Sequence, residues 1–320
     1  AGLYAGESET AEAGVESFAG ALAWLGTNAQ ADTAYIYLFG ADEEGINYVL
    51  NSSNLASRTG VTLTLKGTGG ERTLQLSAGG TATQSLITVQ SGVTLQLAKN
   101  ITLMGRESGY QRALVFVNGG TIELYDGAKI CGHKNNNGSG NMGDNNAGGV
   151  FVNGGAFLIK GGEISGNQGR FGGGANITCG TLIVDGGLIT NNKALNGAGG
   201  LDFCGGTSSI SGGEIRGNIS QNGTVGTGGG IQVKAGTVTM SGGLITENEA
   251  NGTGDDGGGG VMIYGGTFNL TGGVIESNTT TSTKNASAQG SFNLRRAGGS
   301  FSFDTYPDQN LITAENGFKY

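Results

Sequence analysis

The chain has 320 residues, 67 of them glycine and only one proline, and carries a formal net charge of −8 with an isoelectric point near 4.7. A collagen-like fibre needs glycine at every third residue and abundant proline, so this composition excludes one. The acidic balance disfavours nucleic acid and anionic membranes as partners, and no apolar run approaches the roughly 18 residues of a membrane span.

Residues 1–34 combine a short opening with a helical pattern. The opening Ala1-Gly2-Leu3 is not a signal peptide, so we expect a mature secreted form, extracellular or at a bacterial cell surface. An apolar stripe at helical spacing predicts a helix over residues 13–30 that covers the first coil, with Trp24 beside the stripe. The stripe consists of Val15, Phe18, Leu22 and Leu25.

Residues 35–112 alternate apolar and polar side chains, which is the pattern of half-buried strands. Examples are Val61–Leu65, Leu74–Leu76 and Val93–Leu97. We expect irregular early coils of a repeat structure here.

Residues 113–278 contain a nineteen-residue frame that occurs five times and runs from the second glycine of a Gly-Gly pair to an asparagine. Successive frames start 25, 26, 30 and 30 residues apart, so the frame is constant and only the linkers vary. Fixed units joined by elastic linkers are typical of solenoids. The frames start at Gly149, Gly174, Gly200, Gly230 and Gly260 and end at Asn167, Asn192, Asn218, Asn248 and Asn278.

Each frame predicts three short strands that close one coil. Two alternating apolar pairs and one invariant isoleucine face inward, and a glycine at each of two bends supplies positive φ. Because like positions stack on like, we expect a core column of isoleucines and a hydrogen-bonded ladder of the terminal asparagines. The core column comprises Ile164, Ile189, Ile215, Ile245 and Ile275.

The predicted fold is an all-β, right-handed parallel β-helix forming one elongated domain, with a capping helix at its N-terminal end. A period near two dozen residues and the lack of a 3.6-residue pattern in the frames favour it over helical or leucine-rich repeats. Residues 279–320 lose the frame, and this tail is expected to cap its own last coil or that of a neighbour.

The chain resembles the right-handed parallel β-helix surface proteins of host-associated bacteria, especially those of the treponeme type. The unit Gly161-Gly162-Glu163-Ile164-Ser165-Gly166-Asn167 is similar to the repeat of that family, and Ala21–Leu25 with Tyr35–Phe39 is similar to its opening. The resemblance implies an adhesin or surface antigen. More distantly, the predicted architecture is similar to that of pectate lyases.

An enzyme of the β-helix type would place carboxylates on adjacent coils, as a calcium site or an acid pair. The outward columns offer no such pair, and the best acidic cluster lies at the end of the fourth frame and in the linker after it. This cluster fits either a calcium or sugar site or a solvated loop, and it fits the loop better. We therefore expect no cofactor, with calcium as the alternative. The cluster consists of Glu247, Glu249, Asp255 and Asp256.

Histidine and cysteine are too few to define a catalytic or disulfide framework. His133, the only histidine, occupies the place of a ladder asparagine and is expected to substitute for it rather than act as a base. Cys179 and Cys204 lie near the same bend of successive coils, where a bridge and two free thiols are both open, and Cys131 stays unpaired.

The free positions between inward side chains predict apolar columns on the outside of the coils. Monomers rarely leave contiguous apolar patches open, so either a linker covers these columns or another subunit packs on them. With the second alternative, we predict a non-catalytic surface protein that is adhesin-like or assembles into a layer or filament. Its partners would be copies of itself or a host or matrix glycan or protein. The alternative is a polysaccharide lyase or hydrolase, and the free columns lack the Thr-x-Thr array that ice binding requires. The predicted surface comprises Phe116, Phe151, Leu158, Ile183, Leu188, Leu244 and Val274.

Overall fold

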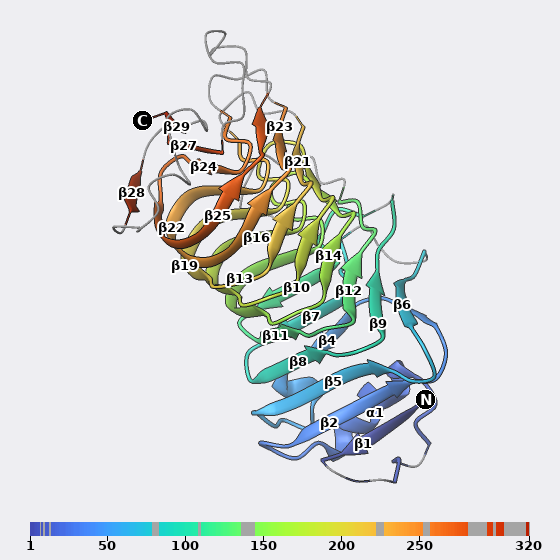
Figure 1. Ribbon diagram of the computed structural model, residues 1–320. Helices are drawn as coiled ribbons and strands as arrows, with labels where there is room; N and C mark the ends of the chain where they lie inside the picture. The colour runs from blue at the N-terminus through green and yellow to red at the C-terminus, as the bar shows by residue number, and fades with distance from the viewer. Residues whose placement is uncertain are drawn as a thin grey trace.

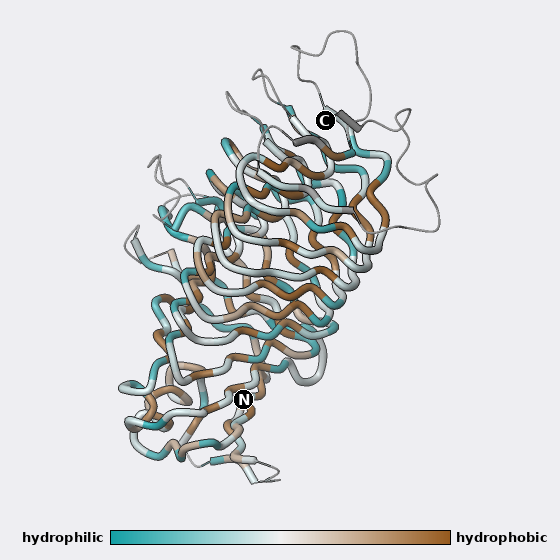
Figure 2. The backbone as a smooth tube through the Cα atoms, turned by 90° about the vertical axis from the view of Figure 1, so that its left-hand side faces the viewer, coloured by the Kyte–Doolittle hydropathy of each residue, from teal (hydrophilic) through white to brown (hydrophobic). Residues whose placement is uncertain are grey.

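The protein is a parallel β-solenoid, as the sequence predicts (Figure 1). The computed structural model describes residues 1–320 except 7, 9, 13, 79–82, 108–109, 136–144, 222–226, 252–256, 281–292, 297–298, 304–317 and 320. The coils stack into an elongated body with the single α-helix of the described residues near the N-terminal end, and a short 3₁₀ helix, η1 (Ser52–Asn54), follows in the first coil. The hydrophobic segments of successive turns lie above one another in Figure 2.

Three faces of each coil are formed by parallel strands joined from coil to coil in one continuous ladder. The first face contains β4 (Tyr48–Leu50), β7 (Ile87–Gln90), β10 (Val115–Asn118) and the first parts of β13 (Val150–Ile159), β16 (Ala175–Val184), β19 (Leu201–Ile210) and β22 (Ile231–Thr246), followed by β24 (Val261–Ile263), β27 (Leu294–Arg296) and β29 (Phe318–Lys319).

The second face contains β2 (Ala34–Phe39), β5 (Val61–Gly67), β8 (Val93–Leu97), β11 (Thr121–Leu124), the later parts of β13, β16, β19 and β22, then β25 (Thr267–Glu276) and β28 (Ser300–Phe303). The third face contains β3 (Glu43–Gly45), β6 (Arg72–Leu76), β9 (Ile101–Met104), β12 (Ala128–Cys131), β14 (Glu163–Ser165), β17 (Leu188–Thr190), β20 (Glu214–Arg216) and the ends of β22 and β25.

A fourth, separate parallel sheet of two-residue strands follows the frame asparagines, and the sequence analysis did not anticipate it. The second residue of each strand is small, and it is buried in every strand except the last. The chain passes so close to the Gly-Gly pairs here that a Cβ on Gly173 or Gly199 would clash with the strand backbone. Close approach, rather than positive φ, therefore requires these glycines. The strands are β15 (Gln168–Gly169), β18 (Lys193–Ala194), β21 (Ile219–Ser220), β23 (Glu249–Ala250) and β26 (Thr279–Thr280).

The isoleucines of the five frames stack in register, each at most 4% exposed. The same column continues into the irregular coils through Leu74, Leu103 and Ile130. The early and late coils therefore share one apolar core, which explains how the solenoid continues where the sequence repeat fades.

The bends have positive φ at nearly all the predicted glycines, from 71° at Gly162 to 93° at Gly180, but Gly266 is an exception. A third left-handed bend comes directly before each frame asparagine and was not predicted. It is occupied by Gly166, Asn191, Gly217, Glu247 and Ser277, with φ between 54° and 63°.

The asparagine side chains form a buried ladder along the solenoid. The Oδ1 of Asn218 accepts from the backbone N–H of Asn192 at 3.0 Å and from its Nδ2 at 3.0 Å, while the Nδ2 of Asn218 donates to the carbonyl of Ile189 at 2.8 Å and to Asn248 Oδ1 at 2.9 Å. The same pattern repeats in the neighbouring frames. Every polar atom of the amide is used, which offsets its complete burial.

The N-terminal end is covered by α1 (Phe18–Asn28), shorter than the predicted 13–30, and by β1 (Gly2–Ala5), which pairs antiparallel with β2. Ser17 caps α1 by accepting from the backbone N–H of Gly20 at 3.1 Å. The Glu43 carboxylate accepts from the N–H of Phe18 at 2.7 Å and from the Tyr37 hydroxyl at 2.6 Å. An antiparallel strand and a capped helix thus close this edge of the sheet.

The C-terminal segment differs from the expectation of a frameless tail. Asn293 Oδ1 accepts from Asn278 Nδ2 at 3.0 Å and so extends the ladder, while β27 and β28 add to the first and second faces in register. The repeat was missed because Gly299 stands where the bend glycine belongs but without the preceding Gly-Gly signature of the frame.

Candidate functional site

The free positions of the first face lie under a second layer of chain and are not exposed as predicted. Phe151 is 1% exposed and packs with Ala113 and Ala147, with half-buried Phe116 beside it at 5.4 Å between ring centroids. Phe151 is therefore not part of an open surface. Of the two alternatives for this column, a covering linker and a packed subunit, the linker is the one found at Phe151.

The same covered column becomes polar in later coils and contains a buried ion pair. Asp202, fully buried, accepts from Lys234 Nζ at 2.7 Å, and the ammonium lies 4.4 Å from the centroid of the Phe171 ring. Gly197 packs so closely here that a Cβ would clash with the Asp202 carboxylate. The pair is enclosed by the linker, so its geometry supports packing of the linker on the coil rather than contact with a substrate.

Cys204 borders this ion pair. Its Sγ lies 3.7 Å from Asp202 Oδ1 and accepts from Asn176 Nδ2 at 3.5 Å. Burial, with the nearby Asp202 carboxylate, raises the pKa of the Cys204 thiol to about 12. The thiol therefore stays protonated at neutral pH and is a poor nucleophile. Cys131, Cys179 and Cys204 are all free, which decides between the two possibilities left open for the last two.

A charged cluster lies on the second face of the N-terminal coils. Glu123 accepts from Tyr125 at 2.6 Å, from Gln96 at 2.9 Å and from Lys160 at 3.0 Å. Burial acts to raise the pKa of Glu123, but these three hydrogen bonds outweigh it and keep the pKa below its ordinary value. We call Gln96, Glu123, Tyr125 and Lys160 the charged cluster. It holds an ionised carboxylate with its acceptor sites largely used.

The predicted acidic site falls partly outside the described residues, because Asp255 and Asp256 lie in the range 252–256. Glu247 is exposed at a left-handed bend with φ of 56°, and Glu249 is half-buried in β23. Among the described residues, no group of three or more His, Cys, Asp or Glu side chains is placed to hold a metal ion. Glu247 thus occupies a bend of the backbone with its side chain in solvent, and this placement does not require a bound ligand.

The remaining members of the predicted apolar surface are half-buried. Leu158 pairs in register with Ile183 on the second face, and Leu244 pairs with Val274 on the third, but Glu214 separates Leu188 from Leu244. These side chains form short apolar strips rather than one continuous patch.

His133 is 1% exposed and lies at the ladder position. Its backbone N–H donates to Asn167 Oδ1 at 3.2 Å, its Nε2 lies 2.8 Å from the Arg112 carbonyl, and its Nδ1 accepts from the Arg106 N–H at 3.3 Å. Burial lowers the pKa of His133 to about 4, against a smaller opposing effect of the Arg112 hydrogen bond. The imidazole is therefore neutral, with both nitrogens engaged by backbone.

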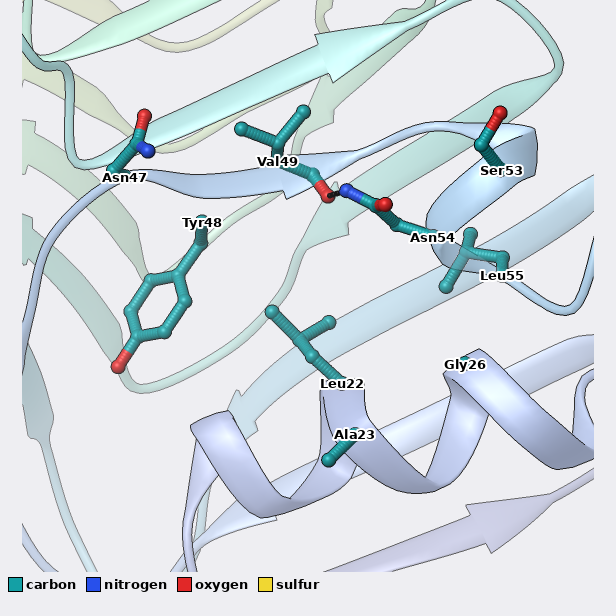
Figure 3. Close-up of a pocket in the computed structure, with 9 residues that line it drawn as sticks. All are labelled: Leu22, Ala23, Gly26, Asn47, Tyr48, Val49, Ser53, Asn54 and Leu55. Carbon is teal, nitrogen blue, oxygen red and sulfur yellow. Dashed lines mark hydrogen bonds between the residues drawn. The ribbon is translucent and has the colours of Figure 1, made fainter.

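A pocket lies between α1 and the first coil (Figure 3). Leu22, Tyr48 and Leu55 contribute apolar surface, and Asn54 Nδ2 is committed to the Val49 carbonyl at 3.0 Å. No charged side chain is among the lining residues, so the pocket offers little to fix a polar ligand.

Sequence reasoning missed a polar column on the second face. Threonine follows the middle glycine of the later frames at Thr181, Thr207, Thr237 and Thr267. The sequence analysis considered the alternating positions that begin one residue later and passed over these threonines. The structure places these residues at the start of outward columns, half-buried or exposed.

No family model, no curated protein and no solved structure matches this chain. None of the helices in the described part of the chain is long and apolar enough to span a membrane. The class that the fold defines is the parallel β-helix.

Proposed function

We propose that this chain is a non-catalytic surface protein, adhesin-like or a structural subunit of a layer or filament, which contacts its partner through the outer wall of its coils. The observation that carries the proposal is the second face, where strands from β2 to β28 present outward side chains in one register. A long and regular surface suits an extended or repetitive partner.

Three acidic side chains on the coils are engaged by other side chains of the protein, which supports a structural role for them rather than a catalytic one. Glu123 is held by three hydrogen bonds, Asp202 is paired with Lys234 under a linker, and Asp185 accepts from Ser211 at 2.6 Å. The location outside the cell is part of the proposal and rests on the likeness of the repeat to surface proteins.

The alternative is a polysaccharide lyase or hydrolase, and one observation favours it. The charged cluster brings a carboxylate, a phenol and an amine within hydrogen-bond distance, since Lys160 Nζ also lies 3.1 Å from the Tyr125 hydroxyl. An acid and a base of this kind can serve proton transfer when they reach a substrate.

The test combines binding, assembly and turnover on the purified chain. We expect binding to an immobilised panel of glycans and matrix proteins, or concentration-dependent assembly by light scattering, without release of reducing ends from any glycan. A monodisperse monomer that binds nothing would contradict the proposal. Reducing-end release that disappears in Glu123→Gln or Glu247→Ala would favour the enzyme.

A further inference from the structure

The C-terminal coils present a flat array of short uncharged side chains on the second face. Four strands, β19, β22, β25 and β28, contribute two outward residues each, and every neighbouring pair is in register. We call this array the hydroxyl face. It consists of Thr207, Ser209, Thr237, Thr239, Thr267, Asn269, Ser300 and Ser302.

The spacing of the array follows from the sheet. Adjacent strands lie about 4.8 Å apart, and alternate residues of one strand about 6.6 Å apart, so the polar groups form a two-dimensional lattice. Asn269 Nδ2 donates to Thr239 Oγ1 at 3.4 Å, and the Ser302 hydroxyl donates to Asn269 Oδ1. Threonine is stiff at χ1, and the backbone is fixed by buried neighbours such as Val238 and Phe268, so the lattice is organised before any ligand arrives.

The chemistry of this face selects a neutral partner that both donates and accepts hydrogen bonds. Hydroxyls do both, the threonine methyl groups add small apolar contacts, and none of the eight side chains is ionisable. The ammonium of Lys234, on the corner that precedes Thr237, is paired with the Asp202 carboxylate at 2.7 Å. The face therefore lacks the fixed charge that an acidic or basic partner would need.

An exposed aromatic side chain stands at the edge of the same face. Tyr264 is 47% exposed and follows β24 at the corner that leads into Thr267, where its N–H donates to the Val233 carbonyl at 2.8 Å. Only Leu195, at 36%, is comparably exposed among the large hydrophobic side chains of the described residues. A tyrosine with an open ring face and a hydroxyl is suited to stacking on a sugar ring.

We propose that the hydroxyl face, with Tyr264 at its edge, binds an extended neutral polysaccharide. This inference rests on the proposed surface function and specifies its ligand class. The expectation that the free columns lack a regular Thr-x-Thr array stands, because only Thr237-Val238-Thr239 has that pattern, and the neighbouring strands carry Thr207-Ser208-Ser209 and Thr267-Phe268-Asn269. Sugar hydroxyls repeating along a chain would meet the lattice, and the sugar C–H surface would meet the methyl groups and the tyrosine ring.

The experiment is affinity electrophoresis of the full chain through gels containing a soluble β-1,4-glucan, β-1,3-glucan or α-glucan, with polygalacturonate as the acidic comparison. We expect retardation by at least one neutral polysaccharide and none by polygalacturonate. Thr239→Lys should weaken the association constant about tenfold or more by placing a charge in the lattice, and Tyr264→Ala should weaken it by a similar factor. Thr73→Lys, the same substitution at a half-buried threonine of β6 on the third face, is the matched control and should bind as the wild type does.

Several outcomes would overturn the inference. These are equal loss of binding in Thr239→Lys and Thr73→Lys, retardation by polygalacturonate alone, growth inhibition of ice crystals without glycan binding, or dimers that dissociate in Thr239→Lys. Binding to a matrix protein or an acidic glycan in the broader panel, with no neutral polysaccharide bound, would leave the surface function standing while removing this ligand class. Circular dichroism of each variant separates loss of binding from loss of fold.

Discussion

The N-terminal and C-terminal halves of the second face share one backbone but carry different outer chemistry. Around β11 and β13 the wall bears Glu123, Tyr125 and Lys160 linked by hydrogen bonds, whereas from β19 to β28 it bears short uncharged side chains. From β11 to β25 the inward positions of this face are buried, and all of them are apolar except Ser208. The interior of a solenoid is constrained by stacking, and the outward columns are free to differ, so function is to be sought in them.

If the two halves share one kind of core, truncating a core side chain should destabilise both halves equally. These substitutions should have the largest effects of those considered. Ile164→Ala and Ile245→Ala should each lower the free energy of unfolding by about 2–5 kcal/mol, because both side chains are fully buried in the same column. Urea unfolding would measure both, with Ile164→Val and Ile245→Val as controls at about 0.5–1.5 kcal/mol each. If one alanine variant is strongly destabilised and the other is as stable as the wild type, the two halves do not share one kind of core.

The ladder should matter nearly as much as the core. Asn218→Ala removes an amide that accepts two hydrogen bonds and donates two. The backbone N–H of buried Asn192 loses its Asn218 acceptor, and Asn192 Nδ2 keeps only its bond to the Ile164 carbonyl. We expect a loss of about 3 kcal/mol, and thermal unfolding would show it. The exposed Asn153→Ala should change stability by less than about 0.5 kcal/mol, and similar losses in both variants would contradict a ladder.

The N-terminal end of the ladder should be pH-dependent where the asparagine rungs are not. The pKa of His133 is lowered to about 4 by burial, so the unfolded chain, with an ordinary pKa near 6.5, binds the proton more readily. This contribution is complete above about pH 6.5 and is lost as the pH falls towards 4, amounting to about 2 kcal/mol between pH 7 and pH 5. In His133→Asn the free energy of unfolding should differ less between the two pH values than in the wild type. An unchanged difference would show that His133 is not the source of the pH dependence.

The smallest effect concerns the charged cluster. Lys160→Ala removes one hydrogen bond to Glu123 from a partly exposed position, so the cost should stay below about 1 kcal/mol. The same change should raise the pKa of the Glu123 carboxyl towards its ordinary value, which a side-chain NMR titration would follow. Lys129→Ala, from the looser 4.0 Å pair with Glu163, should leave that pKa in place.

Sequence could predict the parts of the fold that repeat in a column. Isoleucine and asparagine recur at one position of every frame because each is stacked on its own counterpart, and this recurrence predicts the β-helix. The capping helix was predicted separately, from the apolar stripe that includes Phe18 and Leu25. The two-residue strands after the ladder were also signalled, by the small residue in second place, but a two-residue element has no periodicity to recognise.

The covered first face could not be predicted in the same way. Its burial depends on where linkers of different length fold, and the Asp202–Lys234 pair joins residues on successive coils beneath Phe171 from a third. The repeat shows which positions point inward and which point outward, but it carries no information about the chain segments that cover the outward positions. Apolar Phe116, Phe151 and Met262 at free positions were the available hint of a second layer.

Hydroxyl-radical footprinting read by mass spectrometry tests the central claim most directly, with and without the neutral polysaccharide that retards the chain most. We predict that Ile245 and Phe268 stay unmodified in both states, and that the polysaccharide protects Tyr264 but not Tyr125, the tyrosine of the charged cluster. Modification of Ile245 and Phe268 at the level of Tyr264 would contradict the stacked coils, and protection of Tyr125 in place of Tyr264 would contradict the assignment of the hydroxyl face.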